Sequence, residues 1–324
     1  MFMLLVFMSA LTAARADCDA CIQGICHSKK TLIEGFNINK QLAIDRTNNI
    51  LYVEIQDHHT IAFFLDEAKM RSVDANYPGG LTVDQDTREF YTSQTQYYSE
   101  VYAYKYEQGT YKKKIVLYLD GYKSPARLRY EDTLYMINQD GSCAYYDKTS
   151  KSLHGYSNLE NFKVTDLVNV RNATVWFFTS ANKLYRFNWG NNDKKSWTLI
   201  SDERHVLSIG KYGDVYFGDV SARIIYKLDR ETKEMVKYGD YMNSSLEDFV
   251  FDKDENIVFL DHDGNVACWV STGEACTKPH LNSDLSPGKS FLVELVRGGD
   301  DAYNFTYMPK MTLDSKELYE VIEV

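Results

Sequence analysis

Apolar and polar residues alternate along this chain in short segments that come in pairs. Each pair has an apolar segment, a tight polar turn and a second apolar segment, usually centred on an aromatic residue. Period-two alternation is typical of β-strands, and turns of Asn, Asp and Gly are typical of hairpins. The pattern therefore predicts β-hairpins. The seven instances are Leu42–Val53, Leu81–Thr92, Ala126–Met136, Leu167–Phe177, Leu207–Phe217, Phe249–Phe259 and, more weakly, Val293–Phe305.

The second segments recur about every 42 residues along the chain. A repeat of this length holds one hairpin and leaves room for two more strands, which is the size of a β-propeller blade. One blade cannot bury both faces of its sheet, so blades stack around an axis and close a ring. The expected fold is an all-β propeller. The middle residues of the second segments are Tyr52, Tyr91, Tyr135, Trp176, Tyr216, Val258 and Tyr303.

The ends of the chain bear on the number of blades. Val293–Phe305 supplies two strands, Glu317–Ile322 can add a third, and Lys30–Glu34 is a spare strand ahead of the first repeat. Joining this N-terminal strand to the last blade closes the ring, which favours seven blades. If the weak last repeat only caps the ring, the propeller has six. In the first repeat the strands are expected at Gln41–Asp45, Ile50–Gln56, Thr60–Leu65 and Lys69–Asp74.

The first 16 residues are expected to lie outside the propeller. Leu4–Leu11 is a short apolar run, and Ala14-Arg15-Ala16 has the small-x-small pattern at which signal peptides are cleaved. A transmembrane helix needs about 20 apolar residues, and this run is too short. We therefore predict a signal peptide over 1–16, a single propeller domain over 17–324, and secretion to the extracellular space.

The charge balance argues against nucleic-acid partners. The formal net charge is −10, from 36 basic and 46 acidic residues, and so acidic a chain repels phosphate backbones. The basic run Lys112–Lys114 is a local exception. It lies beside Tyr111 on an expected outer strand, where lysines commonly discourage edge pairing, so we interpret it as a solvated edge.

The chain has six cysteines, and an even number in a secreted protein favours disulfides. Cys268 and Cys276 flank Ser271–Glu274, which we interpret as a turn between two strands of the sixth repeat. A hairpin bridge between Cys268 and Cys276 is therefore expected.

The remaining cysteines are Cys18, Cys21, Cys26 and Cys143. The first three form a cluster of odd number, so one of them is expected to reach Cys143. A zinc site built on this cluster and His27 is the alternative, which oxidising export disfavours.

Three N-x-S/T sequons agree with secretion. Asn172 lies in an expected hairpin turn and Asn243 in an expected loop, so both are predicted glycosylation sites. Asn304 falls inside an expected strand and is the weakest candidate.

Sequence motifs for catalysis are absent: there is no G-x-S-x-G nucleophile, no glycine-rich phosphate loop and no H-E-x-x-H motif. Secreted propeller hydrolases usually hold calcium with acidic and Asn side chains of their inner strands. The candidates here do not share one repeat position. We therefore expect no catalysis, no cofactor and no metal, with a calcium-dependent hydrolase or lactonase as the alternative. These candidates are Asp45, Asp84, Asp166, Asn169, Glu247 and Asp248.

Two turns that follow second strands contain histidine, at His58 and His262. Such turns gather at one mouth of a propeller's axial channel, so these side chains are candidate ligand contacts. The alternative is that both are polar hairpin loops, since Asp-His-Asp-Gly suits a tight turn.

Aromatic residues are abundant, with 25 Tyr, 16 Phe and 4 Trp. Those at the repeated second-strand position are expected to pack between blades. Tyr97 and Tyr122 instead lie in expected loops, where they can stack on a flat ligand.

Polar residues at the same mouth are expected to set the orientation of such a ligand. Arg127 and Arg223 can pair with a ligand carboxylate because the guanidinium fork matches its geometry, and Gln41 adds a polar contact. The alternative for Arg127 is an ion pair with Glu131 or with an acid from another blade.

The segment Lys30–Gln56, and within it the phrase Asn37–Leu51 that contains QLAID, resembles the ommochrome-binding proteins of moths and butterflies. The cysteine-containing start, the length and the expected signal peptide add to the resemblance, which is clearest over the first repeat. A similar phrase occurs in other secreted insect propellers, including relatives of the yellow and royal-jelly proteins. The resemblance implies a haemolymph carrier of pigments derived from tryptophan, and it transfers no ligand-contact residue.

These observations together predict a secreted, non-catalytic and monomeric propeller that binds a small, flat, aromatic pigment. An extracellular protein-interaction module is a further alternative, because Tyr-rich propeller loops also contact protein partners.

Overall fold

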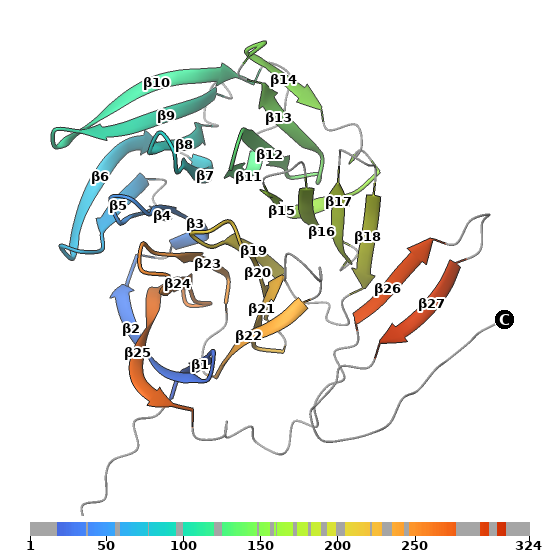
Figure 1. Ribbon diagram of the computed structural model, residues 1–324. Helices are drawn as coiled ribbons and strands as arrows, with labels where there is room; N and C mark the ends of the chain where they lie inside the picture. Colours follow the sequence, from blue (N-terminus) through green and yellow to red (C-terminus); the bar gives the residue numbers. More distant parts are fainter. Residues whose placement is uncertain are drawn as a thin grey trace, which may run out of the picture.

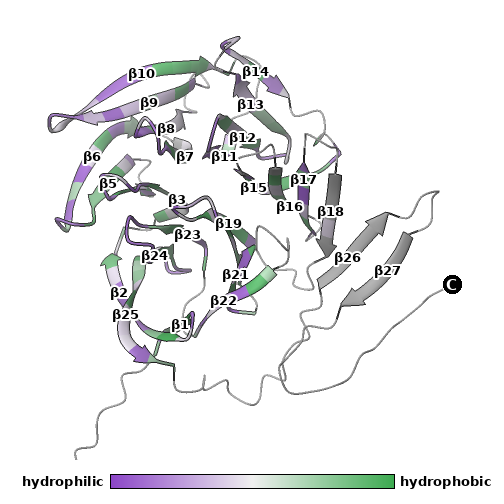
Figure 2. Ribbon diagram, viewed as in Figure 1, coloured by the Kyte–Doolittle hydropathy of each residue, from purple (hydrophilic) through white to green (hydrophobic). Residues whose placement is uncertain are grey.

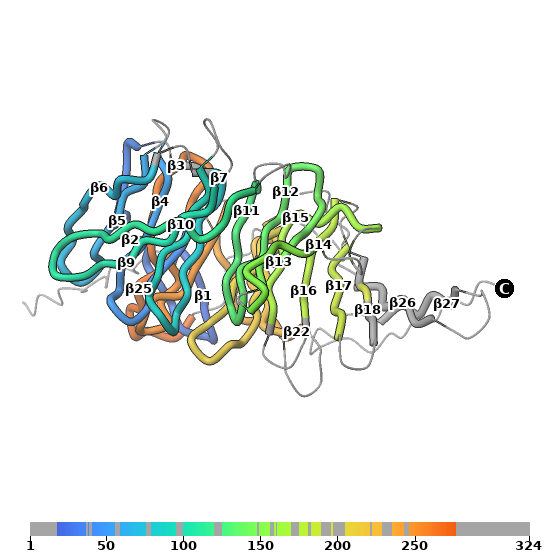
Figure 3. The backbone as a smooth tube through the Cα atoms, turned by 90° about the horizontal axis from the view of Figure 1, so that it is seen from above, coloured from blue at the N-terminus to red at the C-terminus, as the bar shows by residue number. Residues whose placement is uncertain are grey.

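The structure is a computed structural model in which strands and turns, but no α-helix, are found among the described residues. The strands are arranged as small sheets around an axis (Figure 1). Seen from the side, the turns gather at two opposite faces of the ring (Figure 3). The described residues are 18–36, 38–55, 59–76, 78–94, 100–119, 125–147, 149–155, 159, 161–170, 174–180, 183–188, 193–198, 205–220, 222–228, 235–242, 246–276, 292–297 and 303–308.

The repeats form blades of four antiparallel strands, and in the first five blades the strands are consecutive in sequence. Blade 1 contains β3 (Ile38–Asp45), β4 (Ile50–Ile55), β5 (His59–Phe64) and β6 (Lys69–Asn76). Blade 2 contains β7 (Pro78–Asp84), β8 (Glu89–Gln94), β9 (Glu100–Glu107) and β10 (Thr110–Tyr118). Blade 3 contains β11 (Pro125–Tyr130), β12 (Leu134–Asn138), β13 (Cys143–Asp147) and β14 (Ser152–Gly155).

Blade 4 contains β15 (Val164–Val170), β16 (Thr174–Thr179), β17 (Lys183–Asn188) and β18 (Asp193–Thr198). Blade 5 contains β19 (His205–Ile209), β20 (Val215–Asp219), β21 (Ile224–Leu228) and β22 (Met235–Tyr241). Blade 6 contains β23 (Asp248–Phe251), β24 (Ile257–Leu260), β25 (Val266–Ala275) and, as its outer strand, the N-terminal β2 (Ile25–Ile33).

An N-terminal strand therefore completes the last blade of the ring, as predicted, but that blade is formed by the sixth repeat and not by the expected seventh repeat Val293–Phe305. Residues Lys30–Ile33 of the expected strand lie within β2, which pairs antiparallel with β25. The short β1 (Ala20–Ile22) pairs with β22 on its other side, so the outer edges of blades 5 and 6 join in one sheet.

The ring closes with six blades among the described residues, the alternative number from the sequence. Each inner strand contacts the inner strand of the next blade, and β23 of blade 6 contacts β3 of blade 1. The seventh hairpin exists as β26 (Leu292–Arg297) and β27 (Tyr303–Met308), but β26 pairs with β18 at the edge of blade 4. Closure by blade 6 leaves this hairpin no place in the ring. The expected strand Glu317–Ile322 lies outside the described residues.

Burial falls from the axis outward. The second strand β4 is buried at Ile50, Leu51, Tyr52 and Val53, because neighbouring blades cover both of its faces. The outer strand β10 is mostly exposed and carries Lys112–Lys114. Hydrophilic residues accordingly colour long stretches of the outer strands β6 and β10 (Figure 2). This agrees with the interpretation of the basic run as a solvated edge.

Aromatic residues at the repeated position pack between blades, as expected. Tyr52 of blade 1 stacks on Phe90 of blade 2, with ring centroids 4.3 Å apart and planes inclined by 12°. Tyr91 of blade 2 stacks in the same way on Tyr130 of blade 3, at 5.1 Å. Such pairs contribute about 0.5–1.5 kcal/mol beyond the burial of their area. They hold neighbouring blades in register.

The predicted Cys268–Cys276 disulfide is wrong. The segment between the two residues is part of the continuous strand β25, which pairs with β2, and is not a turn between strands. Even with the β-bulge between Ser271 and Ala275, a strand of this length separates Cys268 and Cys276 by far more than the roughly 7 Å that a disulfide can bridge. Cys276 is bonded to Cys21 with a Cα–Cα distance of 6.0 Å, and Cys268 is free and buried.

The expectation that Cys143 pairs with the N-terminal cluster is also wrong. Cys18 is bonded to Cys26 within the cluster, and Cys21 reaches Cys276, so Cys143 is left free and buried. The pairing follows from the N-terminal hairpin, in which β1 carries Cys21 and pairs with β2. Because β2 lies beside β25 and the N–H of Cys276 donates to the carbonyl of Gly24 at 2.9 Å, Cys21 and Cys276 are brought together. Because these four thiols form disulfides, they do not form the alternative zinc site.

Candidate functional site

A carboxylate bound by two arginines lies in the axial channel. Arg127 and Arg129 are two residues apart on β11 and so point to the same side of the strand. Arg127 Nη1 donates to Asp166 Oδ2 at 2.8 Å. Arg129 donates from Nε to Asp166 Oδ1 at 3.0 Å and from Nη2 to Oδ2 at 2.8 Å. The exposed fractions of these side chains are 7%, 13% and 2%, so the three charges are almost fully removed from water.

Backbone groups complete the coordination of this carboxylate. Asp166 accepts the N–H of Leu207 from blade 5 at 3.1 Å and the N–H of Leu167 at 2.9 Å. Burial by itself would raise the pKa of Asp166, but the guanidinium groups of Arg127 and Arg129 outweigh it and hold the pKa below its usual value. Asp166 therefore stays ionised and joins blades 3, 4 and 5.

Arg129 is held in its charged form by the same ion pair. Burial opposes the charge of the guanidinium, but the carboxylate of Asp166 and, more weakly, that of Asp248 raise the pKa of Arg129 above its usual value. Arg129 Nη2 also donates to the carbonyl of Leu207 at 3.1 Å.

Two further polar side chains, those of Asp248 and Gln41, join blades 6, 1, 2 and 3 by hydrogen bonds. Asp248 on β23 accepts the N–H of Leu42 at 2.8 Å, which joins blade 6 to blade 1. Gln41 on β3 donates from Nε2 to the carbonyls of Leu81 at 2.7 Å and Leu128 at 2.8 Å. Its Oε1 accepts the N–H of Leu81 at 3.2 Å. The amide of Gln41 thus joins blades 1, 2 and 3.

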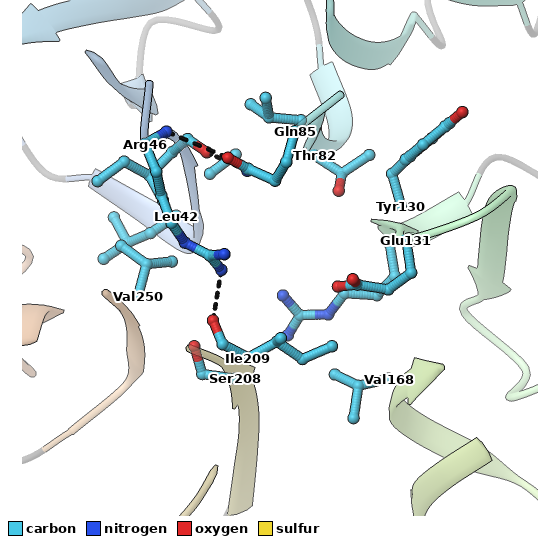
Figure 4. Close-up of a pocket in the computed structure, with 14 residues that line it drawn as sticks. Leu42, Arg46, Thr82, Gln85, Tyr130, Glu131, Val168, Ser208, Ile209 and Val250 are labelled. Atoms are coloured by element: carbon cyan, nitrogen blue, oxygen red, sulfur yellow. Dashed lines mark hydrogen bonds between the residues drawn. The ribbon is translucent and has the colours of Figure 1, made fainter. Parts of the chain in front are cut away.

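A small cavity of about 60 Å³ opens at the mouth where the inner strands end. Its walls combine apolar side chains with charged and polar groups from several blades (Figure 4). A cavity of this volume holds about two water molecules or one carboxylate group. The charged and polar side chains that line it are Arg46, Thr82, Gln85, Arg129, Glu131 and Ser208.

Arg46 reaches across this mouth from blade 1 to blade 5. It lies in the turn after β3, and its backbone N–H donates to Gln85 Oε1 at 3.2 Å. Its guanidinium donates to the carbonyl of Ile209 (Figure 4). It also donates to the carbonyl of Gly210 at 3.3 Å. Burial lowers the pKa of Arg46, against the opposing effect of the carboxylates of Glu131 and Glu255. The charge of Arg46 is therefore poorly compensated.

The structure places Gln41 and Arg127 among the predicted ligand contacts in the channel. Both residues are buried, and both contact neighbouring blades. The ion pair of Arg127 with Asp166 is the arrangement that the alternative interpretation expects, an acid from another blade.

His262 and Arg223 lie in turns after second strands. Antiparallel pairing puts these turns at the ends of the strands opposite Arg46, so the cavity opens at the other mouth. His262 lies 3.4 Å from Glu247, measured between Nδ1 and Oε1, and its side chain is 80% exposed. Arg223 is exposed and donates to the carbonyl of Met242.

The remaining predicted positions cannot be placed in this arrangement. His58, Tyr97 and Tyr122, together with the predicted glycosylation sites Asn172 and Asn243, lie outside the described residues. They stay predictions.

Sequence reasoning missed Arg46, Arg129 and Glu131 as a group. Arg46 directly follows the QLAID phrase, and Arg129 follows Arg127 at the two-residue spacing that shares a strand face. The positions of Arg46 and Arg129 along the sequence indicate that their side chains face the channel. They do not indicate which groups from other blades meet there.

The acidic residues that a calcium site needs are used for structure where they are described. Asp84 accepts the backbone N–H groups of Asp86 at 2.9 Å and Thr87 at 3.2 Å, so it caps a hairpin turn. Asp166 and Asp248 bind the arginine and backbone groups given above. Within the described ranges, no three His, Cys, Asp or Glu side chains are grouped so that they could hold a metal ion. In the same part of the chain, no helix has the length and apolar character to cross a membrane.

No protein-family model matches this chain, and no curated protein matches it. Among solved structures it is similar to a protein of unknown function from Bacteroides thetaiotaomicron, with a TM-score of 0.58 and 11% identity over 76% of each chain. It is also similar to the WD40 β-propeller domain of Doa1, with a TM-score of 0.53 and 9% identity over 75% of this chain and 97% of that chain.

A third similar structure is virginiamycin B lyase from Staphylococcus aureus, with a TM-score of 0.50 and 11% identity over 72% of this chain and 81% of that chain. At such identities the similarity establishes the propeller fold alone. A WD40 domain and a lyase share this fold, so the fold does not decide between binding and catalysis.

Proposed function

We propose that this protein is an extracellular, non-catalytic carrier of a small, flat, aromatic ligand of the kind derived from tryptophan. The cavity at the Arg46 mouth is the observation that carries this proposal. Charged groups from blades 1 and 3 face a mainly polar space whose walls also contain the apolar side chains of Leu42, Val168 and Val250, and small-molecule sites combine apolar walls with such polar groups.

The size of the cavity limits which part of the ligand enters it. About 60 Å³ accommodates one polar end of a pigment, whereas a fused ring system needs several times this volume. The ring system would therefore lie outside the cavity, on the rim of this mouth.

The electrostatics of the channel support ligand binding without catalysis. A general base works best when its pKa lies near the working pH. The pKa of Asp166 is held below its usual value by two arginines, so this carboxylate is a poor proton acceptor. Its charge stabilises the ring instead.

The disulfides support the extracellular part of the proposal. Cys18–Cys26 and Cys21–Cys276 form and persist in oxidising compartments such as the secretory pathway and the extracellular space. A monomer is the state we propose for the free protein, to be checked by its elution volume and by light scattering.

The proposal is tested by titrating the purified, secreted protein with a xanthommatin-type pigment while the visible spectrum and the Tyr and Trp fluorescence are followed. A saturable change at micromolar pigment with one site per chain is expected. Absence of a saturable change would contradict the carrier function. Hydrolysis of esters or lactones that calcium supports and a chelator abolishes would favour the enzyme alternative.

A further inference from the structure

We infer that the cavity at the Arg46 mouth is a binding site for a single carboxylate group, with Arg46 as its main charged partner and Arg129 as the second. This inference deepens the proposed function, because it names the chemical group by which the carrier holds its ligand. The same site would bind other aromatic monocarboxylates of suitable shape.

The first argument is the poorly compensated charge of Arg46. The guanidinium donates to two neutral carbonyl oxygens, those of Ile209 and Gly210, and forms no ion pair with a carboxylate of the described residues. Its Nε is buried and has no hydrogen-bond partner among the described residues. A cation removed from water without a bound anion carries a desolvation cost, which an entering carboxylate would offset.

The second argument is the donor geometry on the opposite wall. Arg129 donates from Nε and Nη2 to Asp166 and from Nη2 to the Leu207 carbonyl, while no hydrogen bond to the described residues uses Nη1. The Asp166 ion pair fixes the position of this guanidinium. Arg129 is therefore a pre-organised second donor beside the cavity, and guanidinium groups are well matched to carboxylate oxygens.

The third argument concerns selectivity. Glu131 directly follows β11, lines the cavity and acts on the charge of Arg46. A carboxylate at this position attracts an ammonium group of the ligand and repels a second negative charge. The site therefore favours a monocarboxylate or an amino-acid end over a dianion such as phosphate.

The same contacts have a competing structural explanation, in which Arg46 only ties blade 1 to blade 5 across the channel. The two explanations differ in what they predict for ligands. A purely structural arginine affects thermal stability and leaves the discrimination between a charged and a neutral ligand unchanged.

The test uses indole-3-acetate and its neutral analogue indole-3-acetamide as probes, which have the same ring and nearly the same shape. Calorimetric titration of the full secreted chain should give an affinity for the acid at least about tenfold higher than for the amide, the difference expected of a charge-assisted hydrogen bond. In Arg46→Met this difference should disappear. Equal affinities of the unmodified protein for acid and amide would overturn the inference, as would a preference that survives in Arg46→Met.

Two further variants complete the design. Arg88→Met removes the same charge from an exposed position in the equivalent turn of blade 2, outside the cavity, and should leave the preference for the acid unchanged. Glu131→Gln, at an exposed position, should bind the acid about two- to fivefold more tightly, because one repulsive charge is removed. If Arg46→Met does not fold, unchanged affinity for the acid in Glu131→Gln overturns the inference.

Pigment titrations distinguish failure of this inference from failure of the proposed function. A pigment that binds equally well to the unmodified protein and to Arg46→Met keeps the carrier function and overturns the carboxylate site. Binding of indole-3-acetate that depends on Arg46, without any binding of pigment, keeps the site and overturns the pigment carrier.

Discussion

Arg129 and Asp166 form a bidentate ion pair between blades 3 and 4, with Nε–Oδ1 and Nη2–Oδ2 distances of 3.0 and 2.8 Å. Asp166 also binds Arg127 and the backbone of blade 5, so one buried carboxylate compensates two guanidinium groups. The parallel pair of hydrogen bonds fixes the orientation of Arg129, which in turn forms one wall of the mouth cavity. The stability of the ring and the geometry of the candidate site therefore depend on the same carboxylate.

Asp166→Asn should lower the free energy of unfolding by about 3–5 kcal/mol, because it leaves two buried guanidinium groups with only the more distant carboxylate of Asp248, 3.9 Å from Arg127. Urea unfolding followed by tryptophan fluorescence measures this change. Asp86→Asn, at an exposed position in a blade 2 turn, is the control and should change the free energy by less than about 0.5 kcal/mol. A loss below about 1 kcal/mol for Asp166→Asn would mean that the ion pair contributes little.

The same carboxylate should make stability depend on pH in the acid range. The pKa of Asp166 is lower in the folded than in the unfolded chain, so ionisation favours folding. This contribution is complete above the unfolded pKa of about 3.9 and is lost as the pH falls through the lower folded value. Melting temperatures measured from pH 6 to about pH 2 should therefore fall less steeply below the unfolded pKa for Asp166→Asn than for the unmodified protein. Parallel curves for the two proteins would contradict this assignment.

The Cys21–Cys276 bridge closes a loop with a sequence separation of 255 residues. Cys21→Ala and Cys276→Ala should each lower the free energy of unfolding by about 2–5 kcal/mol, and the double variant should lose no more than either single one. Peptide mapping without reduction should link residues 21 and 276 and should find Cys143 and Cys268 as free thiols. A linked Cys268–Cys276 peptide would restore the expectation from the sequence.

Phe90 is fully buried and stacks on Tyr52 at the interface between blades 1 and 2. Phe90→Ala should destabilise the protein by about 3–5 kcal/mol, because it removes the stack and leaves a cavity between two blades. Tyr118→Ala serves as the control, since Tyr118 is 58% exposed on the outer strand β10. Chemical unfolding should show a clearly larger loss of unfolding free energy for Phe90→Ala than for Tyr118→Ala. Similar losses would show that the aromatic stack does not contribute the expected stability.

Tyr97 and Tyr122 lie in the segments between β8 and β9 and between β10 and β11, which join the strand ends opposite Arg46. A ligand bound at that mouth is predicted to stack on both residues, so they test the opposite mouth as the binding site. Replacing both by Ala should weaken pigment binding by at least about tenfold, since each stacked ring contributes on the order of 1 kcal/mol beyond its area. The melting temperature should stay nearly constant, because neither residue lies at the repeated core position. Unchanged affinity, or loss of the fold, would show that these are not ligand contacts.

The chain pattern by itself determined the strands and the propeller. Alternation, hairpin turns and a repeat of about 42 residues are local properties, and they located inner strands such as β3 and β19 to within a few residues. The aromatic at the second-strand position was likewise identifiable as core, because each blade places it against the next. The role of the N-terminal strand followed from counting strands, since a ring leaves no strand unpaired.

Only the tertiary structure decided the number of blades, the disulfide partners and the composition of the mouth. Each depends on residues far apart in sequence, such as Cys21 and Cys276 or Arg46 and Ile209. Ring closure determines which of them meet, because moving the closing blade by one repeat changes every contact across the channel. The periodicity that predicts a blade is the same in every repeat, so it cannot specify which blades face each other.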